Sequence, residues 1–412
     1  MILNLLWFLT KSYILKSKTK VKINLSLQII FALNNIDITK FEIHKAPILV
    51  IFISNNFLFI YLKLNKIKAE NFHLNYRFLM LIFPMHNIII LKENQTIMKN
   101  KIIYVSGVVN FETIIDVDSF PIFYCPIEYP FFGVNSGISG QAYNVAKALK
   151  TLGGNEVIIS GLVGKDLLGK VVVDQIKKLK IDATLIKDSL EATPNSVSLV
   201  DRDNNVKTYM DLKEIQEVND KVSKEEEEKL AKADIVVLSN SNFNRPLLKK
   251  AKELGKKVAT DVHIIGTVND DYNADFMAGS DILFLSKKGL DRINYEDFLI
   301  SIYEKYHNEI IVLGEGREGA MILDAKKHVI YHIDAITLRE IVNTVGSRDA
   351  LFSAFIHFYL RNVDSLEALE LSEVFTSYKI GEAGGSNGFL TQKEVKDKAK
   401  TIDFDVYKIK EF

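Results

Sequence analysis

The chain has 412 residues and is poor in three residue types, with one cysteine, one tryptophan and seven prolines. A single cysteine, Cys125, excludes an internal disulfide and is typical of a protein in a reducing compartment such as the cytosol. We expect Cys125 to be a small, buried or half-buried apolar residue rather than a catalytic thiol. The histidines, His263 among them, show no metal-ligand spacing, so no intrinsic metal site is predicted.

The chain also lacks net charge, because 52 lysines and arginines balance 52 aspartates and glutamates. No strong field of one sign is available to attract nucleic acid or an anionic membrane surface. Neither partner is therefore expected. Together with the single cysteine, this balance predicts a cytoplasmic protein.

Glycine is missing from residues 1–97. All 21 glycines lie at or beyond Gly107, whereas roughly seven would be expected in such a segment at a usual frequency of about 7%. The same segment carries 12 lysines and arginines against 4 aspartates and glutamates. Met98 then opens MKNKIIYVSGVV, which has the pattern of a strand. The composition thus changes abruptly at Met98.

Three interpretations of residues 1–97 compete with a genuine additional domain. A membrane anchor is disfavoured, because the longest uncharged stretch, 46–62, is shorter than the roughly 20 apolar residues of a bilayer span and has Ser-Asn-Asn in its middle. A signal peptide is disfavoured because the charges follow the first apolar run instead of preceding it. We favour the third interpretation, in which 1–97 is upstream sequence before a start at Met98 and is dispensable.

From Met98 onwards, apolar runs of strand length alternate with stretches of helical period. The runs are KIIYVSG, EVIISGLVG, ADIVVLSN, KVATDV, DILFLS and EIIVLGEG, and helices are predicted over 141–152, 224–233 and 246–254. This alternation predicts an α/β domain over 98–412, with a Rossmann-like, mostly parallel sheet covered by helices on both faces.

Two segments interrupt this alternation. Residues 108–132 are rich in aromatics and prolines and are expected to be extended, and 195–212 are expected to form two strands around an Asp-Asn-Asn turn. Together they predict a small accessory sheet. Because ligands of open α/β sheets bind beyond the carboxyl ends of the strands, this sheet is expected to act as a lid there. Its exposed aromatic residues suggest a homodimer through the lid.

The stretch NTVGSRDALFSAF, residues 343–355, has two interpretations. Asp349 is a suitable N-cap for a helix that would begin near Ala350, since aspartate is among the preferred residues at that position. Alternatively, the backbone amides of Gly346, Ser347 and Arg348 form an anion site at a helix N-terminus, with Asp349 beside it as a base.

Five motifs in one order resemble the ribokinase-like, or PfkB, family of sugar and nucleoside kinases. SGVVNFE is similar to its Gly-x-x-Asn-x-Asp, SGISGQAYNVA to its Gly-Gly-x-x-x-Asn-x-Ala, and GLVGKDLLG to its Gly-x-Gly-x-Asp-x-x-Gly. VLGEGREG is similar to its Leu-Gly-x-x-Gly turn with one extra residue, and NTVGSRD to its Asp-Thr-x-Gly-Ala-Gly-Asp. The resemblance covers essentially all of 98–412.

The resemblance implies ATP-dependent phosphorylation of a sugar-like or nucleoside hydroxyl, with Mg²⁺ carried on the nucleotide and room for a monovalent cation nearby. It gives Asp349 the role of the base that accepts the hydroxyl proton. The amides of Gly346, Ser347 and Arg348 would stabilise the charge of the moving phosphoryl group.

On the substrate side, the resemblance gives Glu112 the place of an aspartate that binds sugar hydroxyls. Gly140 and Asn144 match the family residues that approach the sugar, and Gln141 is a weaker candidate in the same turn. Each has a structural alternative, such as an exposed strand carboxylate for Glu112 or an ordinary helix residue for Asn144.

On the nucleotide side, Gly314 and Gly319 would let the backbone pass close to ATP, unless they form a plain turn between strands. Thr344, in the motif of Asp349, is a further nucleotide-side candidate. Lys165 and Asp166 are expected to be structural, as part of a helix cap.

Four departures from the family pattern put turnover in doubt. Asn343 replaces the first aspartate of the last motif, and Arg348 replaces its second glycine, so that either the turn is reshaped or Arg348 has an ordinary conformation and can contact phosphate. Residues 286–289 (Ser-Lys-Lys-Gly) stand where the family has Asn-x-x-Glu, and Ser139 replaces a glycine. A nucleoside kinase, for pseudouridine among others, and a non-catalytic sugar- or nucleotide-binding protein therefore remain alternatives.

Overall fold

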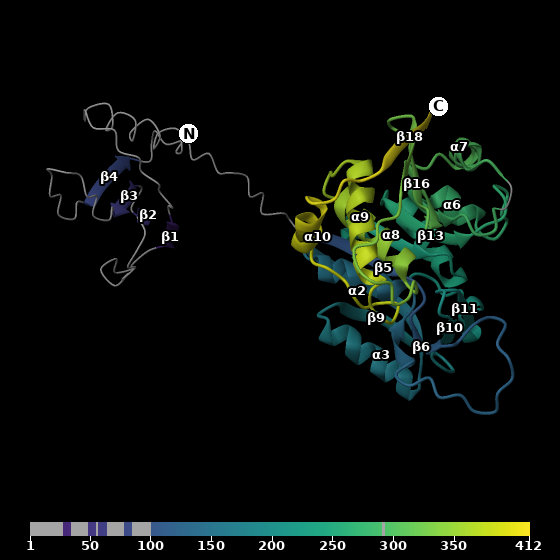
Figure 1. The fold of residues 1–412 in the computed structure, drawn as a ribbon. Helices are drawn as coiled ribbons and strands as arrows, with labels where there is room; N and C mark the ends of the chain where they lie inside the picture. The colour runs from purple at the N-terminus through teal and green to yellow at the C-terminus, as the bar shows by residue number, and fades with distance from the viewer. Residues whose placement is uncertain (1–27, 34–47, 55–56, 64–77, 85–99, 291–292) are drawn as a thin grey trace. The chain divides into compact units, whose positions relative to one another are not determined.

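The computed structural model describes residues 28–33, 48–54, 57–63, 78–84, 100–290 and 293–412 (Figure 1). The chain divides into two compact units, Met1–Ile97 and Met98–Phe412. This boundary coincides with the change in composition at Met98.

The described residues of the first unit form a four-stranded sheet. Its strands are β1 (Gln28–Leu33), β2 (Ile48–Ser54), β3 (Phe57–Lys63) and β4 (Phe78–Pro84), with β1 parallel to β2 and the other pairs antiparallel. The stretch 46–62, weighed above as a membrane anchor, thus contains strands in its described part. Among the described residues, no helix combines the length and apolarity that crossing a membrane requires.

The second unit is built on a ten-stranded sheet in its described residues. The strand order is β18-β17-β16-β15-β14-β13-β12-β5-β8-β9, parallel from β15 to β9 and antiparallel from β15 to β18. The strands are β5 (Lys101–Ser106), β8 (Asn155–Gly164), β9 (Asp182–Leu190), β12 (Ile235–Ser239), β13 (Val258–Ile264), β14 (Ile282–Ser286), β15 (Ile310–Gly316), β16 (Gly319–Asp324), β17 (Val329–Ile333) and β18 (Val406–Glu411).

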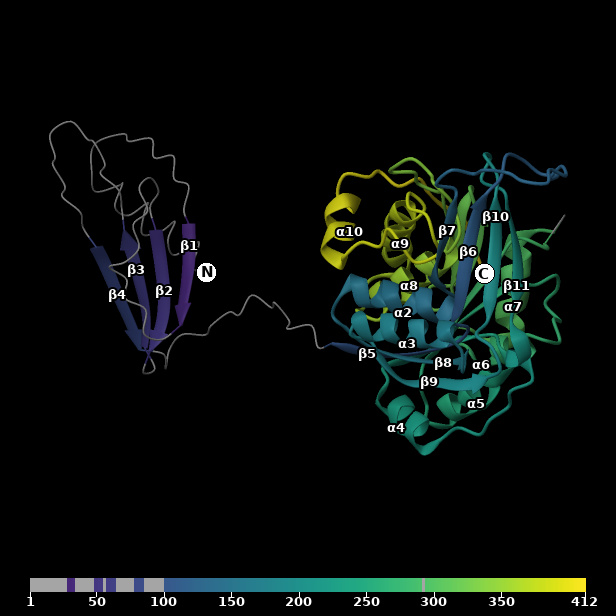
Figure 2. The same ribbon diagram turned by 90° about the horizontal axis from the view of Figure 1, so that it is seen from below.

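Helices cover both faces of this sheet (Figure 2). One face carries α2 (Gln141–Leu152), α3 (Leu167–Lys178), α8 (Ser347–Tyr359), α9 (Ser365–Lys379) and α10 (Gln392–Ala399). The other carries α4 (Lys224–Lys232), α5 (Arg245–Glu253), α6 (Ala274–Gly279) and α7 (Tyr295–Tyr306). Successive strand residues enter opposite cores: Ile103 and Val105 pack under the first helices and Tyr104 under the second. The predicted mostly parallel α/β fold is therefore confirmed, and α2, α4 and α5 match the three predicted helices within one residue.

A separate four-stranded accessory sheet has the order β11-β10-β6-β7. Its strands are β6 (Asn110–Asp116), β7 (Val134–Ser139), β10 (Asn195–Val200) and β11 (Val206–Asp211). Parallel pairing of β6 with β10 places Glu112 opposite Ser196, so the two predicted lid segments do share one sheet. The prediction was wrong in detail, because 117–132 contains no strand in the structure and β7 lies beyond the predicted segment.

The segment 117–132 projects from the domain as a loop in both ribbon views. Its large apolar side chains face solvent, with Tyr124, Phe131 and Phe132 exposed by 92%, 84% and 99%. Cys125 lies in this loop and is exposed, so the expectation of a buried apolar role was wrong. The aromatic density of this segment therefore does not serve the core.

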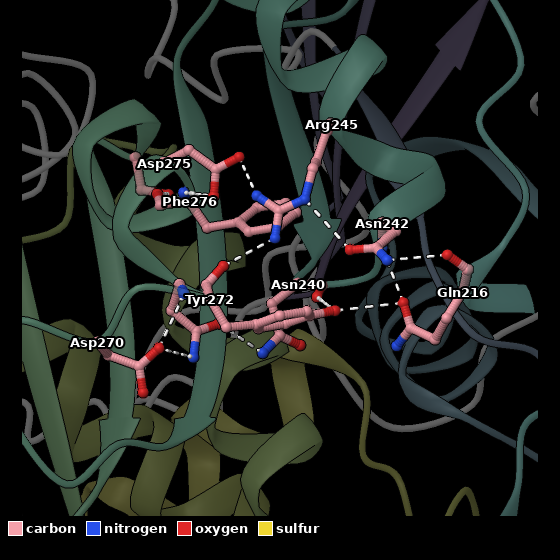
Figure 3. A network of polar contacts seen from close by, with 10 residues as sticks. Gln216, Asn240, Asn242, Arg245, Asp270, Tyr272, Asp275 and Phe276 are labelled. Carbon is pink, nitrogen blue, oxygen red and sulfur yellow. Dashed lines mark hydrogen bonds and ion pairs between the residues drawn. The ribbon is translucent and has the colours of Figure 1, made fainter.

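A polar network ties together the loops that follow β12 and β13 at the carboxyl edge of the sheet (Figure 3). Arg245 pairs with Asp275 and donates to the backbone oxygen of Tyr272 over 2.8 Å. The Tyr272 hydroxyl donates to the backbone oxygen of Asn240 over 2.8 Å and to Gln216 Oε1 over 3.2 Å. These contacts hold the loops beside β13, whose end carries part of the candidate site.

Candidate active site

Asp349 lies in the first turn of α8, which begins at Ser347. Gly346 occupies the N-cap position with φ 75°, and no side chain caps this helix. The N-cap interpretation of Asp349 was therefore wrong, because the helix starts about three residues earlier than predicted. Gly346 has to be glycine here for two reasons. A Cβ would lie 2.1 Å from the backbone oxygen of Gly385, and the backbone of Gly346 has the left-handed conformation that favours glycine.

Asn144 on α2 connects the substrate motif to Asp349. Its Nδ2 donates to Asp349 Oδ2 over 2.7 Å and to Ser139 Oγ over 3.3 Å. Gly140, the N-cap of α2, has φ 95°, and a Cβ there would lie 2.5 Å from the backbone oxygen of Val108. The missing side chain of Gly140 thus lets the start of α2 pack against the residues that precede β6. Asn144 is only 3% exposed.

Glu112 joins the same cluster from β6 and is 7% exposed. A Cβ placed on Gly385 would lie 3.2 Å from Glu112 Oε2, 3.1 Å from Asn144 Nδ2 and 2.6 Å from Ser139 Oγ. The backbone of Gly385 therefore packs directly against all three side chains. Three segments distant in sequence meet here: the start of β6, the turn before α2 and the start of α8.

Burial dominates the electrostatics of the two carboxyl groups. Removal from water raises the pKa of Asp349 to about 7, with the Asn144 hydrogen bond opposing the rise and the Asp261 carboxylate adding to it. Burial also raises the pKa of Glu112, against hydrogen bonds from Ser139 and Gly385. A carboxyl group whose pKa lies near neutrality is suited to accept a proton at physiological pH.

Arg348 precedes Asp349 and has an ordinary helical backbone, so its replacement of the motif's glycine does not force a left-handed conformation. Its Nη1 lies 3.0 Å from His263 Nδ1, and its Nε lies 3.7 Å from Asp261 Oδ2. Because a guanidinium can only donate, His263 Nδ1 accepts this hydrogen bond. Burial lowers the pKa of His263, with the Asp261 carboxylate opposing the fall and the Arg348 charge adding to it.

Both partners of Arg348 lie at the end of β13. Asp261 is fully buried, and its Oδ2 has no hydrogen-bond partner among the described residues. His263 has φ 64°, and the register between β13 and β14 shifts between Asp261 and Ile264. A non-glycine residue in this conformation, at a bulge, is a feature often found at functional sites.

The three amides of the predicted anion site are not equivalent. The Ser347 amide donates to the backbone oxygen of Thr344 over 3.1 Å and is engaged in this conformation. The amides of Gly346 and Arg348 have no acceptor within the part of the chain that the structure describes. The arrangement therefore offers two open donors at the N-terminus of α8.

The nucleotide-side candidates lie in two places. Thr344 is in the loop before α8, next to the buried Asn343. Gly314 is near the end of β15, where its backbone oxygen accepts from Lys287 over 3.1 Å. Gly319 has φ 108°, and a Cβ there would lie 1.9 Å from the backbone oxygen of Ile333. Its missing side chain makes room for the protein's own β17, which favours the turn interpretation of Gly319.

Gln141 and Asp166 make no hydrogen bond to Asp349, in contrast to Asn144. Gln141 is 9% exposed, and neither polar atom of its side chain has a partner among the described residues. Asp166 caps α3 by accepting from the Gly169 amide over 2.8 Å and from Thr193, which confirms its structural interpretation.

Beside Glu112, a hollow of about 580 Å³ opens between the accessory sheet, α2, α3 and the loop 382–387. Lys147 and Gln175 lie in its wall together with Gly385. Across the described residues, no group of three or more histidine, cysteine or acidic side chains could hold a metal ion.

Four residues of this site were missed from the sequence. Asp261 and His263 had a detectable signal, since polar residues directly follow the apolar run of β13 at the carboxyl edge of the sheet. Gly385 had one in the Gly384-Gly385 pair, which marks a turn. Lys379, at the end of α9, is fully buried and had no signal.

Comparisons with known proteins identify relatives among sugar kinases. Over 284 residues the chain is 25% identical to the ribokinase of Lactococcus lactis, covering 65% of this chain and 87% of that protein. Over 302 residues it is 26% identical to 5-dehydro-2-deoxygluconokinase of Clostridium botulinum, covering 63% and 83%.

Solved structures share the fold at low sequence identity. A microbiome-derived acarbose kinase has a TM-score of 0.66 at 22% identity, covering 73% of this chain and 99% of that one. The ribokinase of Arabidopsis thaliana complexed with ribose and ATP has a TM-score of 0.60 at 16% identity, covering 74% and 99%. The model of the pfkB family carbohydrate kinases matches residues 100–392, and the chain belongs to this family of phosphotransferases.

Proposed function

We propose that this kinase transfers the γ-phosphoryl group of ATP to a hydroxyl of a small sugar-like substrate, with Asp349 as the base. The observation that carries the proposal is the cluster in which Glu112 and Asn144 pack against Gly385 and Asn144 donates to Asp349. Glu112 and Asn144 bind sugar hydroxyls, and Gly140 and Gln141 line the same turn. Asp349, whose pKa is raised to about 7, is poised to take a proton from a hydroxyl held there.

The transfer step follows from this arrangement. The substrate hydroxyl loses its proton to the Asp349 carboxylate, and its oxygen forms a bond to the γ-phosphorus of ATP. The bond from that phosphorus to the β–γ bridging oxygen breaks, and ADP leaves with the electron pair. The open amides of Gly346 and Arg348, with Ser347 between them, and the N-terminus of α8 stabilise the negative charge on the moving group.

The nucleotide lies along the carboxyl edge of the sheet in this proposal, next to Thr344, Gly314 and Gly319. Mg²⁺ bound to the ATP phosphates would supply further charge neutralisation. A monovalent cation near the Asn343 loop would act on the nucleotide side. The Arabidopsis ribokinase, solved with ribose and ATP, is the relative that supports ATP as donor.

Two alternatives have specific support. A nucleoside kinase is favoured by the hollow of about 580 Å³ beside Glu112, which lies within the roughly 300–1,000 Å³ of small-molecule sites. A nucleoside kinase of Methanocaldococcus jannaschii also shares the fold, with a TM-score of 0.59. A binding protein without turnover is favoured by Arg348, whose guanidinium contacts His263 instead of standing free.

A screen for ADP release separates these possibilities. The wild-type chain is incubated with Mg-ATP and each of ribose, fructose, fructose 6-phosphate, uridine and pseudouridine. Substrate-dependent ADP release with a sugar supports the proposal, and release with a nucleoside alone supports the first alternative. Binding of ATP without ADP release on any member would favour the binding protein.

The accessory sheet supplies the lid of this proposal, because Glu112 itself belongs to β6. We propose further that the exposed loop 117–132 contacts a second subunit, since a cluster of exposed aromatic residues usually marks an interface. Light scattering tests this: a dimer that becomes a monomer on Phe132→Ser is expected, and a monomeric wild type would contradict it. A cytoplasmic location belongs to the same proposal and follows from the metabolite substrates.

A further inference from the structure

Lys379 is the last residue of α9, and its side chain is fully buried. Its Nζ has no hydrogen-bond partner among the described residues. It also forms no ion pair there, unlike the lysines at the surface of the domain. A buried ammonium without partners is unfavourable, because it has lost its hydration and gained no contact in exchange.

The position of Lys379 relates it to the proposed site. α9 packs along α8, which carries Asp349 in its first turn. The charges that act on Lys379 are those of Glu112 on β6 and Asp349 on α8, and both favour its protonated form. Burial outweighs them and lowers the pKa of Lys379 to about 8. The loop from Gly381 to Gly388 folds back over its backbone, with a Cβ on Gly388 only 3.1 Å from Lys379 Cα.

A structural role does not explain this arrangement. Lysines that stabilise this domain make contacts, as Lys257 does with Glu309 over 2.7 Å and Lys229 with Asp182. Lys379 could be replaced by an apolar residue of similar length without losing a side-chain hydrogen bond or an ion pair to the described residues. A group retained at such a disadvantage is more readily explained by function than by stability.

The chemistry of the cluster indicates what Lys379 would bind. Glu112 and Asp349, when ionised, only accept hydrogen bonds, whereas a sugar hydroxyl both donates and accepts. A hydroxyl that donates to these carboxylates therefore needs a donor for its own oxygen. The two carboxylates also offset the ammonium charge, which disfavours a second anion at this place.

We propose that Lys379 is a substrate-contacting residue whose ammonium donates to an uncharged hydroxyl oxygen of the substrate that Glu112 holds. This inference rests on the proposed function and names a donor for the same site. Substrate binding gives the buried ammonium the partner that it lacks in the free protein. Lys379 thereby also keeps a positive charge near Asp349 while the hydroxyl is bound.

The test compares Lys379→Met and Lys379→Gln with a matched control, Lys398→Met. Lys398, on α10, donates to the Tyr378 hydroxyl near the same end of α9, and it has no role in the proposed site. Melting temperature is measured first, at pH 7. We expect Lys379→Met to melt at or above the wild-type temperature, because it removes an unpartnered buried charge.

Steady-state kinetics follow with ribose, fructose and fructose 6-phosphate as probes. We expect Lys379→Met to raise KM for whichever probe sugar the wild type accepts by about tenfold or more, as for loss of one charged hydrogen bond, with KM for ATP within about twofold. Lys379→Gln keeps an N–H donor, so its KM for the sugar should rise less. The acid limb of the kcat/KM profile should move to higher pH in Lys379→Met, because loss of the positive charge favours protonated Asp349.

Unchanged sugar KM and an unmoved acid limb in both variants would overturn the proposal. A structural role would instead lower the melting temperature of both variants and raise KM for sugar and for ATP equally. That result would also overturn the proposal. If the wild type binds a probe sugar in calorimetry but transfers no phosphoryl group, only the proposed function fails, and Lys379→Met must still weaken that binding. A wild type that neither binds nor phosphorylates any probe overturns both.

Discussion

The substrate half and the phosphate half of the candidate site are built differently. In the substrate half, Glu112, Asn144 and Ser139 form a closed set of contacts around Gly385, with residues that mostly match the family motifs. In the phosphate half, Arg348 stands where the family has glycine and contacts His263 and Asp261. The first half keeps most residues of the family motifs, whereas the second has an arginine in place of a motif glycine.

This difference shows how an arginine can occupy the glycine position of the motif while Asp349 still contacts Asn144. Arg348 adopts a helical backbone, so the helix can start at Ser347 and still carry Asp349 toward Asn144. Its guanidinium contacts the His263 ring and the buried Asp261 carboxylate, both on β13. The predictions below test whether the two halves are separable, as this comparison implies.

The largest effect is expected for Asp349→Asn, which removes the proposed base at the junction of the halves. Turnover should fall by roughly 10²–10⁴-fold, the usual contribution of general-base catalysis. Asp364→Asn is the matched control, because Asp364 is a true N-cap, of α9, and accepts from the Leu366 amide. Near-normal kcat in Asp349→Asn would remove Asp349 from the mechanism.

Arg348→Gly restores the family residue and tests the phosphate half. If the arginine is integral, its loss leaves the buried Asp261 without its neighbouring charge and should lower the free energy of unfolding by about 1–3 kcal/mol. ATP turnover should fall as well, whereas sugar affinity should stay within about twofold. Chemical denaturation and kinetics measure both. Arg348→Lys keeps the charge without the planar guanidinium, so its stability and turnover should lie between those of the wild type and Arg348→Gly. A gain of activity in Arg348→Gly would show that the arginine only disturbs the turn.

Glu112→Ala tests the substrate half. A carboxylate that accepts hydroxyl hydrogen bonds contributes about 1.5–3 kcal/mol per charged bond, so sugar affinity should fall by roughly 10–100-fold. ATP affinity should hardly change. Glu156→Ala, at an exposed position of β8, is the control for loss of a strand carboxylate. Calorimetric titration measures the affinity of each variant for sugar and for ATP. Equal losses of affinity for the two ligands would mean that the halves are not separable.

The smallest effect is expected for removal of residues 1–97, which we propose to be dispensable for the kinase. The boundary between the two compact units at Met98 motivates this experiment. Melting temperature, kcat and both KM values of the shortened protein should equal those of the full chain. Failure of the shortened protein to fold would contradict the proposal.

The sequence predicted the fold well because its signals are local. The apolar runs of β5, β8, β12, β14 and β15 are nearly continuous, as buried parallel strands require. The helical period of 141–152 reproduces the bounds of α2. The start of α8 was misplaced, because aspartate is a preferred N-cap residue and Asp349 was a plausible cap. The true N-cap is Gly346, and glycine is needed there because of its contact with Gly385, which the sequence does not show.

The candidate site was predictable only where a motif carried it. Glu112, Asn144 and Asp349 came from family motifs and lie together. Lys379 could not be found, because its burial results from the packing of α9 on α8 and from the loop that covers it. The partners of Arg348 likewise lie about 85 positions away, so only the folded chain brings them together.

The central claim is that Asp349 acts as a base with a pKa near neutrality, and the pH dependence of kcat/KM tests it most directly. Burial raises the pKa of Asp349 to about 7, and the base works only when ionised. kcat/KM of the wild type should therefore approach its maximum near pH 8 and fall about tenfold per pH unit below about pH 6.5. A profile that stays level down to pH 5 would contradict the account, because a base with that pKa would already be protonated there.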